Sequence, residues 1–166
     1  MEKVDDLRVI MRRWVSGVVV VTSAFEGQQH GMTVDSFTSV SLNPPMVTFT
    51  LANTTRTHAL VSQSGLAGIT LLHAGQAALS EWFAGRSGEH DRFEGVETFK
   101  SITGVPMIKE GMAFLEAKVI HQHAMPTSTL FIAEVITMAK IEDMEPLVYF
   151  NRAYHRLVDE SKTINP

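Results

Sequence analysis

The stretch HGMTVDSFTSVSLNPP, residues 30–45, decides the fold of this chain. Its first part, 30–34, continues a strand, and the short segment 37–42 is rich in serine and threonine. The double proline that follows cannot donate to a strand ladder, so the strand must stop at residues 43–45. The alternating residues 46–51 resume the sheet. This stretch therefore predicts sheet strands that are interrupted by one sharp break.

Upstream of this stretch, the sequence predicts a helix followed by a buried strand. An apolar face recurs at helical spacing within residues 4–14, formed by Leu7, Ile10, Met11 and Trp14. Gly17 then opens the run VVVVT, a β-branched segment typical of a strand buried on both faces. For Trp14, and for Trp82 and Phe83 further along, we expect core packing.

Downstream of the double proline, short strands dominate the pattern. Further strands are predicted at 66–72, 112–121, 130–138 and 147–150, a short helix or turn at 54–61 and a helix at 75–83. Residues 84–111 lack any period and are predicted to form a long excursion. Because few long helices separate the strands, an antiparallel sheet or barrel is favoured over a doubly wound sheet. The predicted fold is mainly β, in a single domain over residues 1–166.

Composition narrows the classes of function. The 166 residues carry 14 basic and 18 acidic side chains, a net charge of −4, which argues against a nucleic-acid partner. The chain has no cysteine, so disulfides, thiolate metal sites, iron–sulfur clusters and cysteine nucleophiles are excluded. The charged start lacks a signal-peptide pattern, and the apolar run 17–21 is too short to span a bilayer. We therefore expect a cytoplasmic protein without a membrane partner.

The densest polar stretch, residues 30–45, is the first candidate for a ligand site. Alternation along the chain places Thr33, Asp35, Ser39 and Ser41 on related faces. Hydroxyls and free backbone N–H groups at a strand end form a concave anion site, and Arg56, just past the next strand, can supply a charge for a phosphate. The alternative interpretation is a β-bulge with ordinary solvent-facing serines and threonines.

Other kinds of site find little support. His121 and His123 lie two residues apart on a predicted strand end, but no third ligand is in sight, so we expect no metal site. No G-x-S-x-G elbow suggests a serine nucleophile, and no G-x-G-x-x-G follows the first strand. A nicotinamide nucleotide, if bound, must therefore bind on a scaffold other than a Rossmann fold.

A family resemblance runs through nearly the whole chain, in order. It is carried by WVSGVVVVT (14–22), HGMTVDSFTSVSLNPP (30–45), TTRTH (54–58), DRF (91–93), LFIAEV (130–135) and PLVYFNRAYHRL (146–157). These segments resemble the flavin reductase-like, FMN-binding split-barrel family, which includes the small reductase components of two-component monooxygenases. The serine- and threonine-rich block that ends in the double proline is the most specific part.

The resemblance implies an antiparallel split β-barrel with Greek-key character, usually a homodimer. It implies FMN or FAD near the subunit interface, NADH or NADPH as co-substrate, hydride transfer by positioning without a catalytic side chain, and a monooxygenase component as partner. The implied contacts of the flavin ring edge and ribityl-phosphate are Thr33, Val34, Asp35, Ser36, Ser39 and Ser41. The implied phosphate end is Arg56 with Thr57 and His58, and the implied nicotinamide side is Tyr149, Asn151, Arg152 and Tyr154.

Two positions depart from the family pattern. Members commonly show Gly-Asp-His where this chain has Pro126-Thr127-Ser128, so Ser128 stands in place of a histidine associated with the pyridine nucleotide. Ala133 stands where a glycine is usual. These departures motivate an alternative function, a flavin-binding protein of the same fold without reductase activity. An oxidase on this fold and a purely structural β-barrel subunit are further alternatives.

Overall fold

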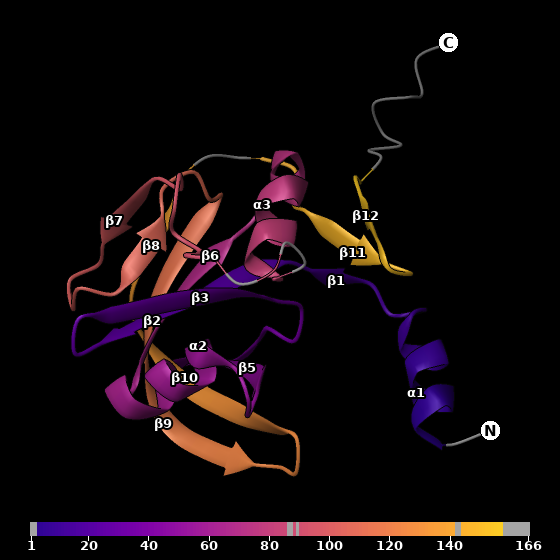
Figure 1. Cartoon of the computed structure of the whole chain (residues 1–166), viewed down its shortest axis with the longest axis horizontal. Coiled ribbons are helices and arrows are strands. Elements are labelled where there is room, and N and C mark those ends of the chain that lie inside the picture. The colour runs from indigo at the N-terminus through magenta and orange to yellow at the C-terminus, as the bar shows by residue number, and fades with distance from the viewer. Residues whose placement is uncertain (1–2, 86–87, 89, 142–143, 158–166) are drawn as a thin grey trace.

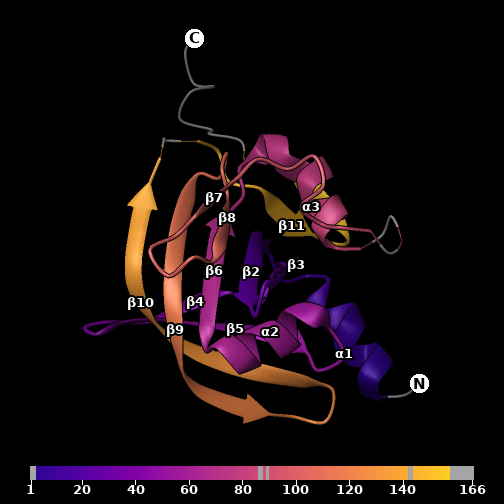
Figure 2. The same ribbon diagram turned by 60° about the vertical axis from the view of Figure 1, so that its left-hand side comes forward.

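The computed structural model describes residues 3–85, 88, 90–141 and 144–157 of the chain. Its main feature is a curved, seven-stranded antiparallel sheet in the order β3-β2-β6-β9-β10-β5-β4 (Figure 1). The central strands stand side by side in Figure 2. The strands of this sheet are β2 (Val19–Phe25), β3 (Gln28–Val34), β4 (Thr38–Leu42), β5 (Pro45–Ala52), β6 (Leu66–Leu71), β9 (Ala113–Ala124) and β10 (Ser128–Lys140). The mainly β, antiparallel fold class predicted from the sequence is confirmed.

Two small sheets flank the main one. The first joins β1 (Ser16–Gly17), β11 (Val148–Phe150) and β12 (Ala153–His155), and the second pairs β7 (Thr98–Lys100) with β8 (Pro106–Ile108). The β1–β11 pairing brings the two distant parts of the chain together. The candidate site described below depends on this pairing.

The valine run forms the centre of the packing. Val19 and Val21 belong to the larger apolar cluster, Val18 and Val20 belong to a second one, and none of the four is more than 4% exposed. Helix α2 (Arg56–Ser64) packs against β2 and β3, while Phe83 of α3 (Ala77–Phe83) is buried in the second cluster. The run is therefore buried on both sides, as its β-branched composition predicts.

The double proline acts as the sequence predicts. Strand β4 ends at Leu42, and the ladder restarts at Pro45, which pairs with Leu42 as the first residue of β5. Proline is tolerated at the first position of a strand because the missing N–H costs no internal ladder bond there. The break thus makes a tight hairpin between β4 and β5.

Both short helices appear where the periodicity indicates. Thr55 caps α2 by accepting a bond of 3.3 Å from the His58 N–H, and Gly65 ends the helix in the left-handed conformation with φ 68°. A short 3-10 turn, η1 (Ala74–Gln76), precedes α3.

The predicted excursion at 84–111 contains the β7–β8 hairpin, which lacks a sequence period. Buried Glu116 anchors it by accepting bonds from Ser101 Oγ and from Thr103.

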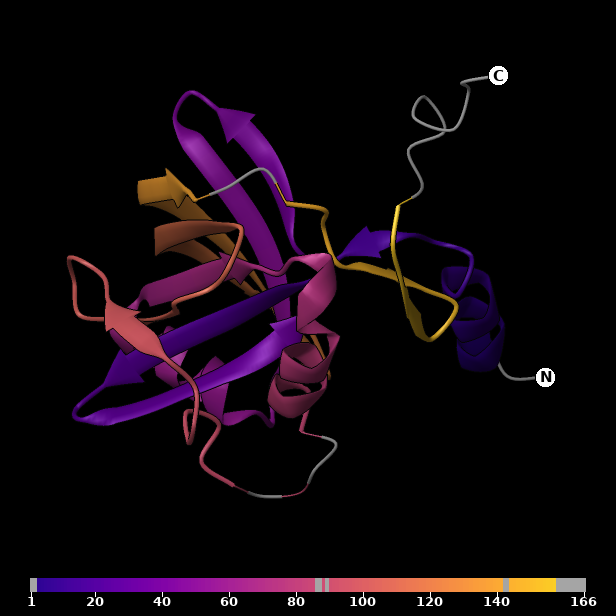
Figure 3. The same ribbon diagram turned by 90° about the horizontal axis from the view of Figure 1, so that it is seen from above.

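The first helix is the main difference from the sequence prediction. Helix α1 (Lys3–Met11) lies beside β1 and the β11–β12 hairpin, apart from the main sheet (Figures 1 and 3). Leu7 and Ile10 are 61% and 65% exposed, and Trp14 is 70% exposed, so the predicted core packing of Trp14 is wrong. Helical periodicity identifies an apolar face, but it does not say what covers that face.

Trp82 and Phe83 agree with their prediction. The Phe83 side chain is fully buried, and the half-buried Trp82 donates from Nε1 to the carbonyl of Arg92 at 2.9 Å. Among the described residues, no helix is both long and apolar enough to cross a membrane.

Candidate active site

A small cavity of about 160 Å³, here called the tyrosine pocket, lies where β3 ends against α3 and the β11–β12 hairpin. It is lined by Val18, Thr33, Asp35, Ala84, Tyr149 and Tyr154. Thr33 Oγ1 donates to the carbonyl of Ser80 at 2.6 Å, and the Ser80 and Tyr154 hydroxyls lie 2.8 Å apart. The two tyrosine rings pack 5.4 Å apart at 55°. The pocket therefore combines aromatic walls with a hydrogen-bonded polar lining.

A second cavity, here called the arginine hollow, shares Asp35 and Tyr149 with the tyrosine pocket and measures about 480 Å³. Its other lining residues are Arg8, Met11, Arg12, Trp14, Ser16, Ser36, Asn151 and Arg152. The Asn151 N–H donates to the carbonyl of Arg12 at 3.2 Å, which ties the end of α1 to the turn of the hairpin. Arg12 Nε is buried and has no hydrogen-bond partner in the described part of the chain. This combination of cations and an exposed indole suits an anionic, ring-bearing ligand.

Together the two cavities gather many of the residues that the resemblance implies. They bring together Thr33, Asp35, Ser36, Tyr149, Asn151, Arg152 and Tyr154. The 33–36 and 149–154 segments meet because β1, which directly precedes β2, pairs with β11. Sequence reasoning missed Arg8, Arg12 and Trp14. The available signal was the pair of basic residues directly before Trp14, next to the WVSG segment that carries the family resemblance.

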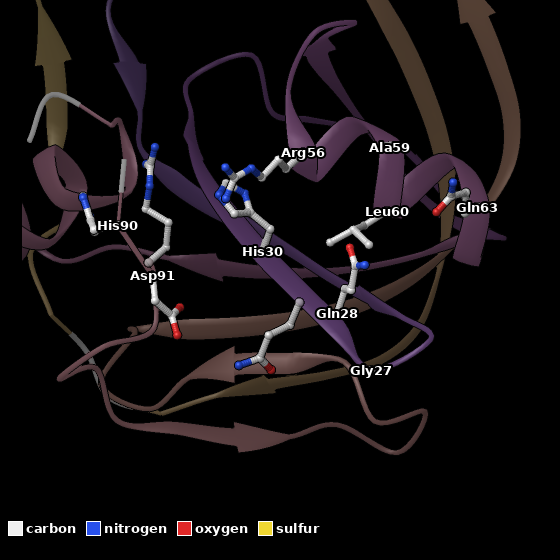
Figure 4. A pocket seen from close by; sticks show the side chains of 11 residues that line it. Gly27, Gln28, His30, Arg56, Ala59, Leu60, Gln63, His90 and Asp91 are labelled. Carbon is white, nitrogen blue, oxygen red and sulfur yellow. The ribbon is translucent and has the colours of Figure 1, made fainter. Parts of the chain in front are cut away.

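Arg56 lies elsewhere, at a third cavity of about 1010 Å³ between β3, α2 and residues 90–92 (Figure 4). We call it the β3-edge cavity. Thr57 beside it is fully buried and bonds His30 Nδ1 at 2.8 Å. His58 Nε2 lies 2.9 Å from Thr129 Oγ1. In the geometry shown, Thr57 and His58 hold the start of α2 in place, and Arg56 presents its charge at the cavity.

The remaining predicted residues are scattered, and Ser36 of the arginine hollow makes a further contact with β5. Val34 is buried in the main core, and Ser36 Oγ bonds both backbone groups of Thr50, at 3.0 and 3.2 Å. Ser39 and Ser41 lie on the outer strand β4, with a register shift between them. The bulge of the alternative interpretation is therefore present at this point of the polar stretch. Ser128 opens β10 opposite Ala52.

The histidine pair of the sequence is exposed on β9, with ring centroids 6.3 Å apart. Across the described ranges, no group of three or more His, Asp or Glu side chains is placed to hold a metal ion.

The electrostatics of the β3-edge cavity are dominated by cations. Burial, and after it the nearby charges of Arg92 and Arg56, together lower the pKa of His30 from 6.5 to about 4. Burial also lowers the pKa of Arg92, with Arg56 adding to the effect. The neutral form of His30 is therefore favoured wherever no anion occupies the cavity.

His30 should make the stability of the protein depend on pH. Its pKa is depressed on folding, so between about pH 6.5 and pH 4 the unfolded chain binds a proton that the folded chain rejects. The contribution of neutral His30 to the free energy of unfolding is fully present above pH 6.5 and is lost as the pH falls toward 4. Urea unfolding of the wild type and of His30→Gln over this range tests it: the variant should lose less stability on acidification. An equal loss in both would contradict the assignment, and exposed His123→Gln is the control.

Comparison with known proteins identifies the family. The sequence model of the flavin reductase like domain matches residues 11–158. The chain belongs to this family. An NADH-dependent flavin reductase of Rhodococcus sp is 32% identical over 154 residues, covering 91% of this chain and 85% of the relative. The reductase component of an FADH(2)-dependent resorcinol hydroxylase from Rhizobium sp. (strain MTP-10005) is 32% identical over 152 residues, covering 90% and 85%.

A solved structure agrees with these sequence relatives. Flavin reductase PheA2 in its native state matches with a TM-score of 0.85 at 32% identity, covering 96% of this chain and 100% of that chain. The family predicted from the motifs is therefore confirmed. The expected class of activity, NAD(P)H-dependent flavin reduction, agrees with the names of these relatives.

Proposed function

We propose that residues 1–166 form one flavin reductase domain, which transfers hydride from NADH or NADPH to FMN or FAD. The observation that carries the proposal is the meeting of the 33–36 and 149–154 segments around the tyrosine pocket and the arginine hollow. The relatives named as NADH-dependent flavin reductases support it. The runner-up is a flavin-binding protein of the same fold without reductase activity, motivated by Ser128 in place of the usual histidine.

The residues present fit such a ligand. Arg12 Nε is a buried donor without a partner among the described residues, and Tyr149 lines both cavities as a shared aromatic wall. A bound flavin would supply the ring that accepts hydride, so the chain needs no nucleophile. The work of the chain is to align two rings and exclude water from between them. Tyr149 and Tyr154 bound the ring space, and Thr33 is locked in place by its bond to Ser80.

The arginines would hold the charged parts of the ligands. Arg12 and Arg152 line the arginine hollow, and Arg56 stands at the first residue of α2. A helix N-terminus and a guanidinium both favour a phosphate. Backbone N–H groups near Asp35 and Ser36 would stabilise negative charge that develops on a reduced ring.

We further propose a cytoplasmic homodimer that passes reduced flavin to a monooxygenase component. The exposed apolar side chains Leu7 and Ile10 of α1, with Trp14 just after this helix, support an interface between subunits. The relative that serves as the reductase component of a resorcinol hydroxylase supports an oxygenase partner.

The proposed function is tested by following the nicotinamide absorbance of NADH in the presence of the protein. We expect rapid oxidation with FMN or FAD and almost none when flavin is omitted. Flavin binding without NADH or NADPH oxidation would favour the non-reductase alternative. A protein that neither binds flavin nor oxidises either nucleotide would overturn the proposal.

Arg56→Ala should raise the flavin KM without harming the fold. Arg56 is exposed, so its removal leaves no cavity, whereas losing a charge-assisted phosphate contact should raise KM about tenfold. Steady-state kinetics with varied flavin measure this, and the thermal midpoint reports the fold. Lys118→Ala removes an exposed charge on β9 and is the matched control. An unchanged KM would remove Arg56 from the phosphate site.

A further inference from the structure

The β3-edge cavity is the largest of the three cavities described, and the tyrosine pocket and the arginine hollow do not account for it. It lies along β3, the outermost strand of the main sheet on that side, between α2 and residues 90–92. Because an edge strand has one neighbour only, every second N–H and C=O group of β3 points away from β2. Backbone donors of β3 that β2 does not engage therefore face this side of the strand.

The charged lining suits a phosphate. His30 and Arg56 lie side by side on one wall, and His90 and Asp91 come from the segment across the cavity (Figure 4). Among the described lining residues, Arg56 and Arg92 outnumber the single acidic residue, Asp91. Burial is the main cause of the lowered pKa values of His30 and Arg92, and repulsion between the cations adds to it. An anion placed between these cations would relieve that repulsion.

Arg92 is held rigidly at this place. Its Nη1 donates to the carbonyls of Trp82 and Phe83, at 3.1 and 2.5 Å, at the end of α3. The Trp82 ring in turn packs 3.8 Å from the ring of His90. A cation fixed by these contacts loses little side-chain entropy when an anion binds.

The rest of the lining suits a nucleoside. Gln28, Gln29 and Gln63 supply amide donors and acceptors, and Ala59 and Leu60 of α2 supply an apolar surface. A phosphate needs the cations, ribose hydroxyls need the amides, and a purine ring needs an apolar surface with polar edges. The cavity offers all three within about 1010 Å³.

We propose that the β3-edge cavity binds the adenylate half of FAD, which makes FAD a better substrate than FMN. The inference rests on the proposed function and deepens it. Arg56 lines this cavity and is also the residue proposed for the phosphate shared by both flavins. A ligand that continues past that phosphate enters the cavity, and FMN ends there. Gln28, Gln63 and Arg92 thus determine flavin preference without touching the reacting rings.

The test places negative charge in the cavity without disturbing the fold. Gln28→Glu and Gln63→Glu change exposed side chains on β3 and α2, and Gln122→Glu is the same change at an exposed position of β9. Each cavity variant should raise the KM for FAD about fivefold at low ionic strength, and added salt should shrink the effect. The KM for FMN should change less than about twofold, because screening weakens the repulsion with distance. Adenosine monophosphate should inhibit FAD reduction competitively in the wild type and less in the variants.

Two outcomes would overturn the assignment while leaving the proposed function intact. One is an equal change in KM for FMN and FAD, which would place the cavity on the shared part of the flavins or outside the site. The other is a raised KM for NADH, measured with FMN as acceptor, with no change for FAD; this would assign the adenylate of the nicotinamide nucleotide to the cavity. If the wild type reduces no flavin, the proposed function itself fails, and titration with adenosine monophosphate alone still reports on the cavity.

Discussion

Ala84→Trp is expected to lower kcat/KM for NADH oxidation about 100-fold while leaving the protein folded. Ala84 is exposed and follows the last residue of α3, so a larger side chain can be accommodated there without overpacking the core. The indole would instead enter the tyrosine pocket, whose volume is only about 160 Å³, beside Thr33 and Tyr149. Rings that must stack within contact distance cannot do so once that space is filled.

The matched control is Ala78→Trp, which adds the same side chain at an exposed position of α3 that does not line the pocket. Stopped-flow or steady-state NADH oxidation measures the loss, and flavin fluorescence separates lost binding from lost transfer. If Ala84→Trp retained wild-type activity, the tyrosine pocket would not be the place of hydride transfer. If both variants lost activity equally, the effect would belong to α3 as a whole.

The parts of the fold that follow from local physics were predictable from the sequence. A continuous run of valines is typical of a strand that is buried on both faces. The double proline lacks backbone N–H groups, so it lies where the ladder needs no hydrogen bond. Thr55 and Gly65 are typical helix boundaries, and α2 lies between them. In each case one or two residues determine the backbone, whatever the rest of the chain does.

The parts that depend on distant contacts were not predictable. The apolar face of α1 has ordinary helical spacing, yet Trp14 lines the arginine hollow and is mostly exposed. The β7–β8 hairpin has too few residues for a period and depends on a carboxylate, Glu116, that lies on β9. Neither arrangement can be inferred from nearby residues.

In the candidate site, too, the local features followed from the sequence and the distant contacts did not. Alternation places Thr33 and Asp35 on related faces, and the structure has both lining the tyrosine pocket, Thr33 within β3 and Asp35 directly after its end. The same alternation grouped Ser39 and Ser41 with them, but the chain turns after β3 and shifts register within β4. Only the family resemblance indicated Tyr149 as a residue of the site. A pairing between β1 and β11 carries no signature in either segment.

Phe131→Ala should lower the free energy of unfolding by about 4 kcal/mol. The side chain is fully buried in the main core, where its ring stacks on Phe49 with centroids 5.3 Å apart and an interplanar angle of 15°. Truncation loses the transfer free energy of the ring and leaves a cavity that β5 and β10 cannot close, because the surrounding ladder holds them apart. Urea unfolding followed by circular dichroism measures the change.

The same substitution should also weaken flavin binding at the phosphate end of the site. The rings of His58 and Phe131 pack in a T-shaped arrangement with centroids 5.5 Å apart. The Thr129 hydroxyl that contacts His58 also donates to Asn53 Oδ1 at 2.8 Å. Loss of the ring therefore frees the segment that presents Arg56, so the flavin KM should rise together with the loss of stability. Ile136→Ala, at a 44% exposed position of the same strand, should cost less than about 1 kcal/mol and leave the KM unchanged. A stable Phe131→Ala protein with normal kinetics would show that the core does not support the 53–58 segment.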